Sequence, residues 1–289
     1  MSDEDAAPEV IDGIRSLHER IDELHQLVAQ RLEAGVRTEA LHTEALHAEG
    51  DWLRGRAGTA LRAARAIPAW QRRTQGELRW PVTVVTAVAI ALQLAVPDRL
   101  ALVRPFWVLP AVQGMLVIVL AMANPHRIDR ESKALRVLAL MLAALLSLAN
   151  GWSVASLAVG IVQGTMGQTA GPLLITGGAI WLTNVVVFAL WYWEFDRGGP
   201  VARALGTERY PDFQFVQMTL PPEMVTPEWE PAFVDYLYLA FTNAAAFSPT
   251  DVMPLSRTAK IGMTVQSIIS IVTIALVVSR AVNILPVHA

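Results

Sequence analysis

The sequence predicts an all-α integral membrane protein with about five or six transmembrane helices, a re-entrant pore helix and loop, and an N-terminal helical arm in the cytoplasm. Of the 289 residues, 53% are hydrophobic, which is too many for an ordinary soluble domain. The apolar residues are concentrated after position 80, whereas residues 1–79 are polar. Within 235–284, an apolar run too short to cross a bilayer precedes a polar turn and a run that is long enough. That order predicts a re-entrant loop.

The composition excludes several classes of function. The net charge of −3 is too small to indicate a nucleic-acid partner. The absence of cysteine excludes a disulfide framework, Cys-ligated metal centres and thiol catalysis. The chain has no P-loop NTPase motif, no dinucleotide fingerprint, and neither the G-x-S-x-G nor the H-E-x-x-H motif. We therefore expect neither an enzyme nor a bound cofactor or metal ion. The acidic first ten residues contain no apolar core, so we expect no cleaved signal peptide.

The arm begins with a short heptad repeat. Its apolar positions alternate between spacings of four and three: Val10, Ile14, Leu17, Ile21, Leu24 and Val28. This pattern is typical of a coiled coil, and it ends where Arg31 takes an apolar position. One interpretation is a multimerisation segment, and the other is an amphipathic helix that folds against its own chain. The nearby histidines have no acidic or cysteine partners at ligand spacing, so we expect them to be solvated.

Residues 54–79 are basic, and Glu77 is their only acidic residue. The arginines alternate with apolar residues, which is typical of a helix at an anionic membrane surface. Because this run directly precedes the first apolar segment, it predicts a cytoplasmic N-terminus.

The apolar segments define the predicted spans, at about 80–96, 102–122, 134–162 and 173–192. The basic loop between the second and third spans is expected in the cytoplasm. Residues 134–162 would measure about 43 Å as one helix. A division near Asn150 would instead give two short helices and six spans in all, and we favour the single helix. Asn184, at depth in the fourth span, is expected to form an interhelical hydrogen bond.

The spans divide the chain into regions. These are a cytoplasmic arm at 1–79, outer helices at 80–193, a cytoplasmic linker at 194–230, and a pore helix, loop and inner helix at 231–289. With five spans the loop enters from the cytoplasm, and with six it enters from outside.

Leu237 to Asp251, LYLAFTNAAAFSPTD, aligns without gaps to the pattern LYFSFVTLTTVGYGD. The segment therefore resembles the pore helix and filter of tetrameric potassium channels, and Pro254 also matches. Where those channels keep a hinge glycine in the inner helix, this chain has Ser270. The membrane domain as a whole also looks like a bacterial family of multi-pass membrane proteins. That likeness implies the bacterial inner membrane and adds no activity.

The filter departs from the potassium-channel pattern. Both filter glycines are replaced, and Pro249 fixes its own φ and restricts Ser248. A ladder of inward-pointing carbonyls needs the freedom of glycine, so potassium selectivity by that route is not implied. The candidate pore-lining residues in the loop are Phe247, Ser248, Pro249, Thr250 and Asp251. The alternative is that the turn only caps the segment after it.

The last helix adds three polar residues on one face, Gln266, Ser270 and Thr273, which could line a pore or join helices to one another. We therefore expect an oligomeric, tetrameric ion channel with weak or non-potassium selectivity. Its expected partners are inorganic ions, the lipid bilayer and further copies of the chain. The alternative functions are a non-conducting scaffold that recruits partners through residues 1–79, and a carrier, which the lack of an internal repeat disfavours.

Overall fold

The computed structural model describes residues 20, 23–24, 26–28, 30–31, 67–128, 132–245 and 251–285. The chain forms two compact units, Met1–Ala66 and Ile67–Ala289. The described residues of the first unit are helical, and Leu24 and Val28 are exposed there. The other heptad positions and the histidines of the arm lie outside the described residues, so the coiled coil stays a prediction.

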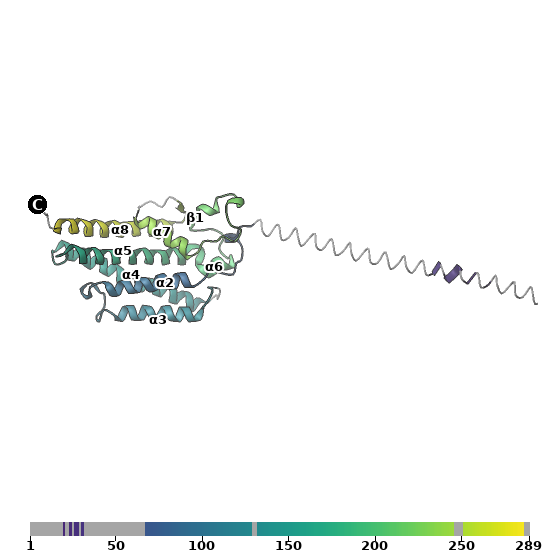
Figure 1. Cartoon of the computed structure of the whole chain (residues 1–289), viewed down its shortest axis with the longest axis horizontal. Helices are drawn as coiled ribbons and strands as arrows, with labels where there is room; N and C mark the ends of the chain where they lie inside the picture. Colours follow the sequence, from purple (N-terminus) through teal and green to yellow (C-terminus); the bar gives the residue numbers. More distant parts are fainter. Residues whose placement is uncertain are drawn as a thin grey trace, which may run out of the picture. The chain divides into compact units, whose positions relative to one another are not determined.

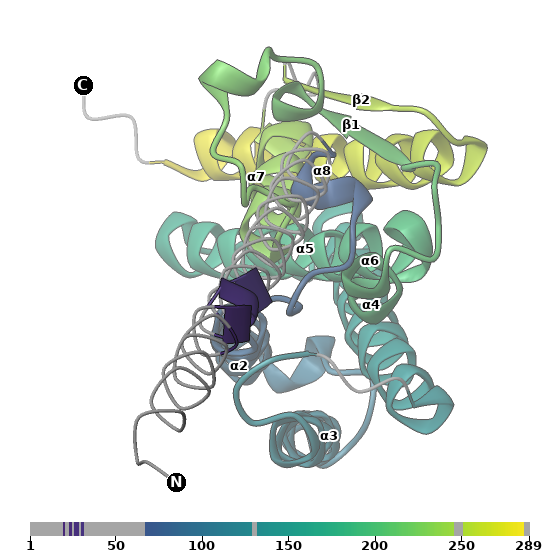
Figure 2. The same cartoon turned by 90° about the vertical axis from the view of Figure 1, so that its right-hand side faces the viewer.

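The second unit is mostly helical (Figure 1). Its main helices are α2 (Trp80–Ala95), α3 (Val108–Ala123), α4 (Lys133–Val162), α5 (Ala170–Phe195), α7 (Phe233–Ala245) and α8 (Arg257–Ile284). α5 lies at the centre and packs against α2, α4, α7 and α8, whereas α3 packs on α2 and α4 (Figure 2). The fold is therefore a helical bundle around α5.

Three helical stretches are long and apolar enough to cross a membrane, as judged by length and composition. They are Lys133–Val162, Ala170–Leu205 and Arg257–Ile284, whereas α2 and α3 are apolar but shorter. α4 continues through Asn150 as one helix of 30 residues, which agrees with the single-helix alternative. The second span was predicted to begin at residue 102, whereas α3 begins six residues later, after Pro105.

The backbone turns sharply after α5. Gly199 has φ 95°, a value that favours glycine, and this turn separates α5 from the short helix α6 (Pro200–Leu205). The linker then forms strand β1 (Phe213–Phe215), which pairs antiparallel with β2 (Val252–Pro254). Among the named elements in the described part of the chain, only these two strands of three residues each are not helical. They join the linker to the segment just before α8.

Close packing between α5 and α8 leads to a first prediction. A Cβ added to Gly177 would lie 2.7 Å from both γ-methyl carbons of Val277, whereas a Cβ on Gly178 would meet nothing within 4 Å. Gly177→Ala should therefore lower the free energy of unfolding by about 1–3 kcal/mol, because α5 and α8 must move apart. Thermal unfolding in detergent checks this, with Gly178→Ala as the matched control.

In the Gly177→Ala background, Val277→Ala should recover part of the lost stability, since it removes the methyl carbons that clash. Equal stability of the Gly177→Ala and Gly178→Ala variants would show that this contact does not constrain the helices.

Candidate functional site

α7 enters the bundle and stops part-way along it. At its start, the Phe233 amide donates to Glu77 Oε2 at 2.8 Å, next to the first turn of α2. Near its end, Asn243 Nδ2 donates to the Met263 carbonyl at 3.0 Å, inside α8. With 13 residues, α7 is about 20 Å long, well below the ~30 Å of a bilayer hydrocarbon core.

The chain returns to the end at which it entered. β2 pairs with β1, and the Leu255 amide donates to the Asp212 carbonyl at 2.8 Å. The Asp212 amide in turn donates to Asp196 Oδ1 at 2.7 Å, and Asp196 also accepts from Tyr236 in the first turn of α7. The segment from α7 to β2 therefore enters and leaves at the same end of the bundle. This arrangement is compatible with the predicted re-entrant loop, whose place in a membrane stays a prediction.

The tip of α7 is fixed by a buried amide network. Gln266 on α8 is fully buried, and its Oε1 accepts from Tyr192 Oη at 2.7 Å and from Asn243 Nδ2 at 2.8 Å. Its Nε2 donates to the Ala240 carbonyl at 2.8 Å. We call Tyr192, Asn243 and Gln266 the tip network. It connects α5, α7 and α8 near the C-terminal end of α7.

The predicted polar face of α8 exists, but it faces inward within one chain. Ser270 accepts from Asn184 Nδ2 at 3.1 Å, so Asn184 forms the interhelical hydrogen bond that its position predicts. Thr273 donates to the Ile269 carbonyl of its own helix at 2.8 Å. Gln266 and Ser270 are 0% exposed and Thr273 is 5% exposed. In the single chain Gln266 and Ser270 join helices and Thr273 bonds within α8, and the pore-lining role of all three stays a prediction.

The loop residues predicted to line a pore, Phe247, Ser248, Pro249 and Thr250, lie outside the described residues. Asp251 is described and is half-buried. Its Oδ1 is buried without a hydrogen-bond partner in the described part of the chain. It directly precedes β2, so it lies where the chain turns back toward β1.

An apolar face is left uncovered beside the loop. On α7, Val234, Tyr238 and Phe241 are exposed at spacings of four and three. On α8, four of the exposed apolar residues follow the same pattern: Ile261, Val265, Ile268 and Val272. We call these residues the α7 stripe and the α8 stripe. Uncovered apolar rows of this size mark contact with lipid or with another protein.

The base of α7 is held by a second cluster that sequence reasoning missed. Arg203 forms an ion pair with Glu77 at 2.9 Å, and Trp193 Nε1 donates to the same carboxylate oxygen at 2.7 Å. Arg203 also donates to the Trp193 carbonyl at 2.6 Å and to the Asp196 carbonyl at 2.9 Å. Its guanidinium lies 5.0 Å from the ring centre of Tyr236. We call Glu77, Trp193, Asp196, Arg203 and Tyr236 the base hub.

The pKa values of two carboxyl groups near the base hub, those of Glu230 and Asp235, are raised. Thr74 donates to Glu230 at 2.8 Å, but burial together with the nearby Glu77 charge raises the pKa of Glu230. Burial also raises the pKa of Asp235, while the Ala232 amide that donates to it opposes the shift. One signal for the hub was present in the sequence, because Glu77 is the only acid among the arginines of 54–79.

Residues 67–79 belong to the second unit and bond to other parts of it. The Arg79 amide donates to the His126 carbonyl at 3.1 Å, and Arg197 donates to the Trp70 carbonyl. Among the described residues, no group of His, Asp or Glu side chains could hold a metal ion. No protein-family model, curated protein or solved structure matches the chain.

Proposed function

We propose that the protein is a multi-pass membrane protein that forms an oligomeric, tetrameric ion channel, with its pore built from α7, the loop that follows it and α8. The observation that carries the proposal is the course of the segment from α7 to β2. α7 enters the bundle at one end and stops part-way, and β2 lies at that same end. Irregular backbone at membrane depth is tolerated where protein buries it or where it lines a water-filled path. In the proposed arrangement, the chain after Ala245 would begin at membrane depth, because α7 ends part-way along the bundle, beside Met263 of α8.

The uncovered stripes support assembly. The α7 stripe and the α8 stripe lie on the two helices that flank the loop, and both are apolar. Neighbouring copies arranged around an axis would cover them and bring the loops together, as closed rings of subunits do. Phe247 and the alanines before it would then form a narrow apolar constriction, with hydroxyl groups from Ser248 and Thr250 beside it.

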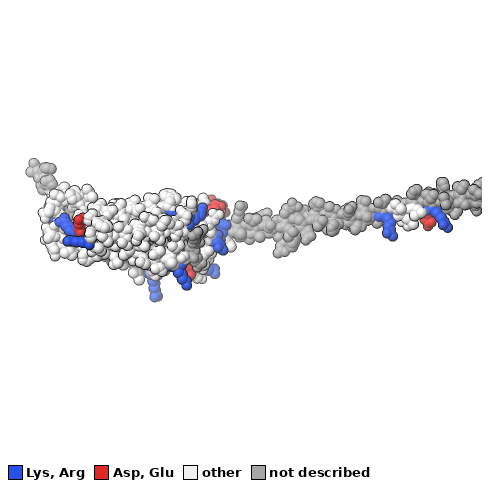
Figure 3. Space-filling model, turned by 90° about the horizontal axis from the view of Figure 1, so that it is seen from below, with Lys and Arg blue, Asp and Glu red and all other residues white. Residues whose placement is uncertain are grey.

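The distribution of charge supports the membrane orientation. On the face seen in Figure 3, most charged side chains of the second unit lie toward its two ends. In the proposed arrangement α2, α3, α4, α5 and α8 span the inner membrane of a bacterium. The end that carries residues 67–79 and α6 would be cytoplasmic because of its arginines. The loop would then enter from the cytoplasm, inverted relative to potassium channels.

Purified protein in liposomes tests conduction. We expect passive flux of small inorganic ions above that of empty liposomes, with little preference for K⁺ over Na⁺. Ser248→Ala and Thr250→Ala should change the flux or the selectivity, because they remove the hydroxyl groups nearest the constriction. Thr219→Ala, an exposed hydroxyl in the linker, is the matched control.

No flux above empty liposomes, with the protein folded and inserted, would contradict the channel. It would favour the scaffold alternative, in which the cytoplasmic arm recruits partners.

A further inference from the structure

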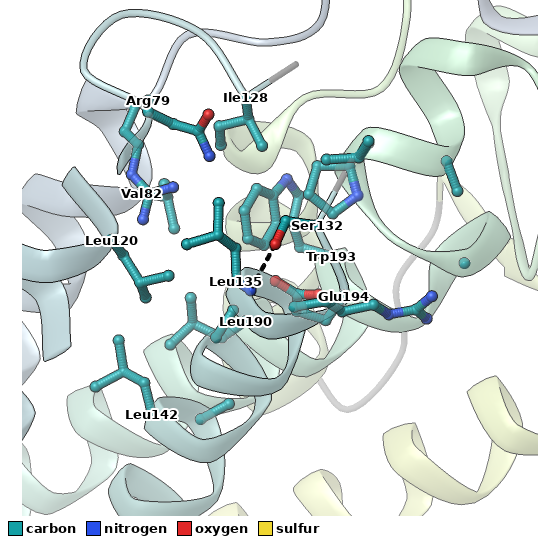
Figure 4. Close-up of a pocket in the computed structure, with 18 of the residues that line it drawn as sticks. Arg79, Val82, Leu120, Ile128, Ser132, Leu135, Leu142, Leu190, Trp193 and Glu194 are labelled. Atoms are coloured by element: carbon teal, nitrogen blue, oxygen red, sulfur yellow. Dashed lines mark hydrogen bonds between the residues drawn. The ribbon is translucent and has the colours of Figure 1, made fainter. Parts of the chain in front are cut away.

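A cavity of about 250 Å³ lies away from the re-entrant segment, between the ends of α2, α3, α4 and α5 and next to α6. Figure 4 shows that one side of it is apolar, with Leu120, Leu142 and Leu190 side by side. Its volume is slightly below the ~300 Å³ at which pockets for drug-sized ligands begin. It is therefore large enough for part of an amphiphile, such as a headgroup or a segment of an acyl chain.

The other side of the cavity carries charges of both signs. Arg79 precedes the first turn of α2, and Lys133 and Arg136 stand in the first turn of α4. Glu194, from the last turn of α5, also lines the cavity, and Figure 4 shows it apart from Arg79. The site thus presents an anion-binding group and a cation-binding group next to an apolar wall.

Several of these polar groups are buried without a partner. Glu194 is only 4% exposed and its carboxylate accepts no hydrogen bond within the described chain, but its oxygens are not fully buried. Asn124 is 3% exposed, and its Oδ1 has no partner in that same part of the chain. Arg79 Nε is likewise buried and unpaired there. Each such atom costs about 1–3 kcal/mol, so the two around one cavity, together with the Glu194 carboxylate, favour a ligand that supplies the missing partners.

We propose that this cavity binds a phosphoethanolamine headgroup, with the first part of one acyl chain of the phospholipid against the leucine side. The phosphate would accept from Arg79 and Arg136, as guanidinium groups favour. The ammonium would donate to Glu194 and to Asn124 Oδ1, which satisfies both acceptors. The proposal rests on the membrane location but not on ion conduction.

Other headgroups fit less well because of the paired charges. A phosphatidylglycerol headgroup can donate hydroxyl hydrogen bonds to Glu194, but it has no positive charge to balance the carboxylate, which then faces a like charge. A choline headgroup carries a positive charge but no N–H, so it cannot donate to Glu194 or Asn124. The order of affinity should therefore be phosphatidylethanolamine above phosphatidylcholine and phosphatidylglycerol with the same acyl chains.

Native mass spectrometry of the full chain in detergent, titrated with each of the three lipids, tests this. We expect phosphatidylethanolamine to bind about tenfold more tightly than the other two, the difference that one hydrogen bond to a charged group makes. Glu194→Gln should abolish that preference, whereas Glu228→Gln, an exposed carboxylate, should preserve it. Equal affinity for all three lipids, or a preference that survives in Glu194→Gln, would overturn the proposal.

Two further measurements cover folding and the source of the headgroup. Leu120→Trp fills the apolar side and leaves Glu194 in place, so it should weaken binding of every lipid while the protein stays folded. Unchanged binding in this variant would overturn the acyl-chain contact.

Soluble phosphoethanolamine should compete only weakly, because it lacks the acyl chain. Competition as strong as that of the lipid would mean that a free phosphoamine, not a bilayer lipid, is the ligand.

Discussion

Replacing Arg203 by methionine is expected to lower the free energy of unfolding by about 3–5 kcal/mol, the cost of breaking a buried ion pair from one side. Arg203 is 5% exposed and is the cationic partner of Glu77 in the base hub. Without it, Glu77 keeps its hydrogen bonds from Trp193 and from the Phe233 amide but loses the charge that balances it. Chemical unfolding in detergent, followed by tryptophan fluorescence, measures the loss.

Two variants identify the cause of this effect. Arg203→Lys keeps the charge but loses the fork of donors that reaches Glu77 and two carbonyl groups at once, so an intermediate loss is expected. Arg209→Met removes an exposed arginine six residues away and should stay within about 0.5 kcal/mol of the unmodified protein. If Arg203→Met were as mild as Arg209→Met, the hub would not hold the base of α7.

Replacing Gln266 by leucine is expected to cost about 2–4 kcal/mol. Tyr192 Oη then loses its only acceptor in the tip network, and Asn243 Nδ2 keeps only the Met263 carbonyl as its acceptor. An unsatisfied buried donor costs about 1–3 kcal/mol, and the tip of α7 also loses the bond from Gln266 to Ala240. Thermal unfolding in detergent measures the change.

Thr264→Val is the control for this substitution, because Thr264 is exposed on the same helix and donates only to its own turn. It should be close to neutral. Gln266→Glu preserves both acceptor contacts, and its loss should come from the missing Nε2 donor and the added charge. Equal stability of Gln266→Leu and Thr264→Val would contradict the role given to the tip network.

The course of the helices could largely be predicted from the sequence, because long apolar runs bounded by proline, glycine and charge give a local signal. The first span was predicted at 80–96 and α2 ends at Ala95. The fourth was predicted at 173–192, ending in the aromatic cluster of Trp191, Tyr192 and Trp193, whereas α5 continues to Phe195. An aromatic belt marks a membrane interface and does not by itself end a helix.

The clusters around α7 could not be predicted in the same way. Trp193, Asp196 and Arg203 are close in sequence, but Glu77 lies before α2 and Tyr236 on α7, and nothing local connects those two to the others. For Gln266 and Ser270, periodicity predicted a shared face, but only the packing of α5 and α7 shows that this face is buried in one chain. The cavity lined by Glu194 and Arg79 also joins helices that are far apart in sequence.

The base hub also constrains the order in which the protein is made. Glu77 of the hub accepts a hydrogen bond from the Phe233 amide, and the two residues are 156 positions apart in sequence. A chain emerges from the ribosome with its N-terminus first. The contacts of Glu77 and the rest of the hub with Phe233 and Tyr236 therefore cannot form until most of the second unit has been translated. The early helices must therefore associate while these charges are still hydrated. The contact that fixes the half-helix is thus one of the last to form during biosynthesis.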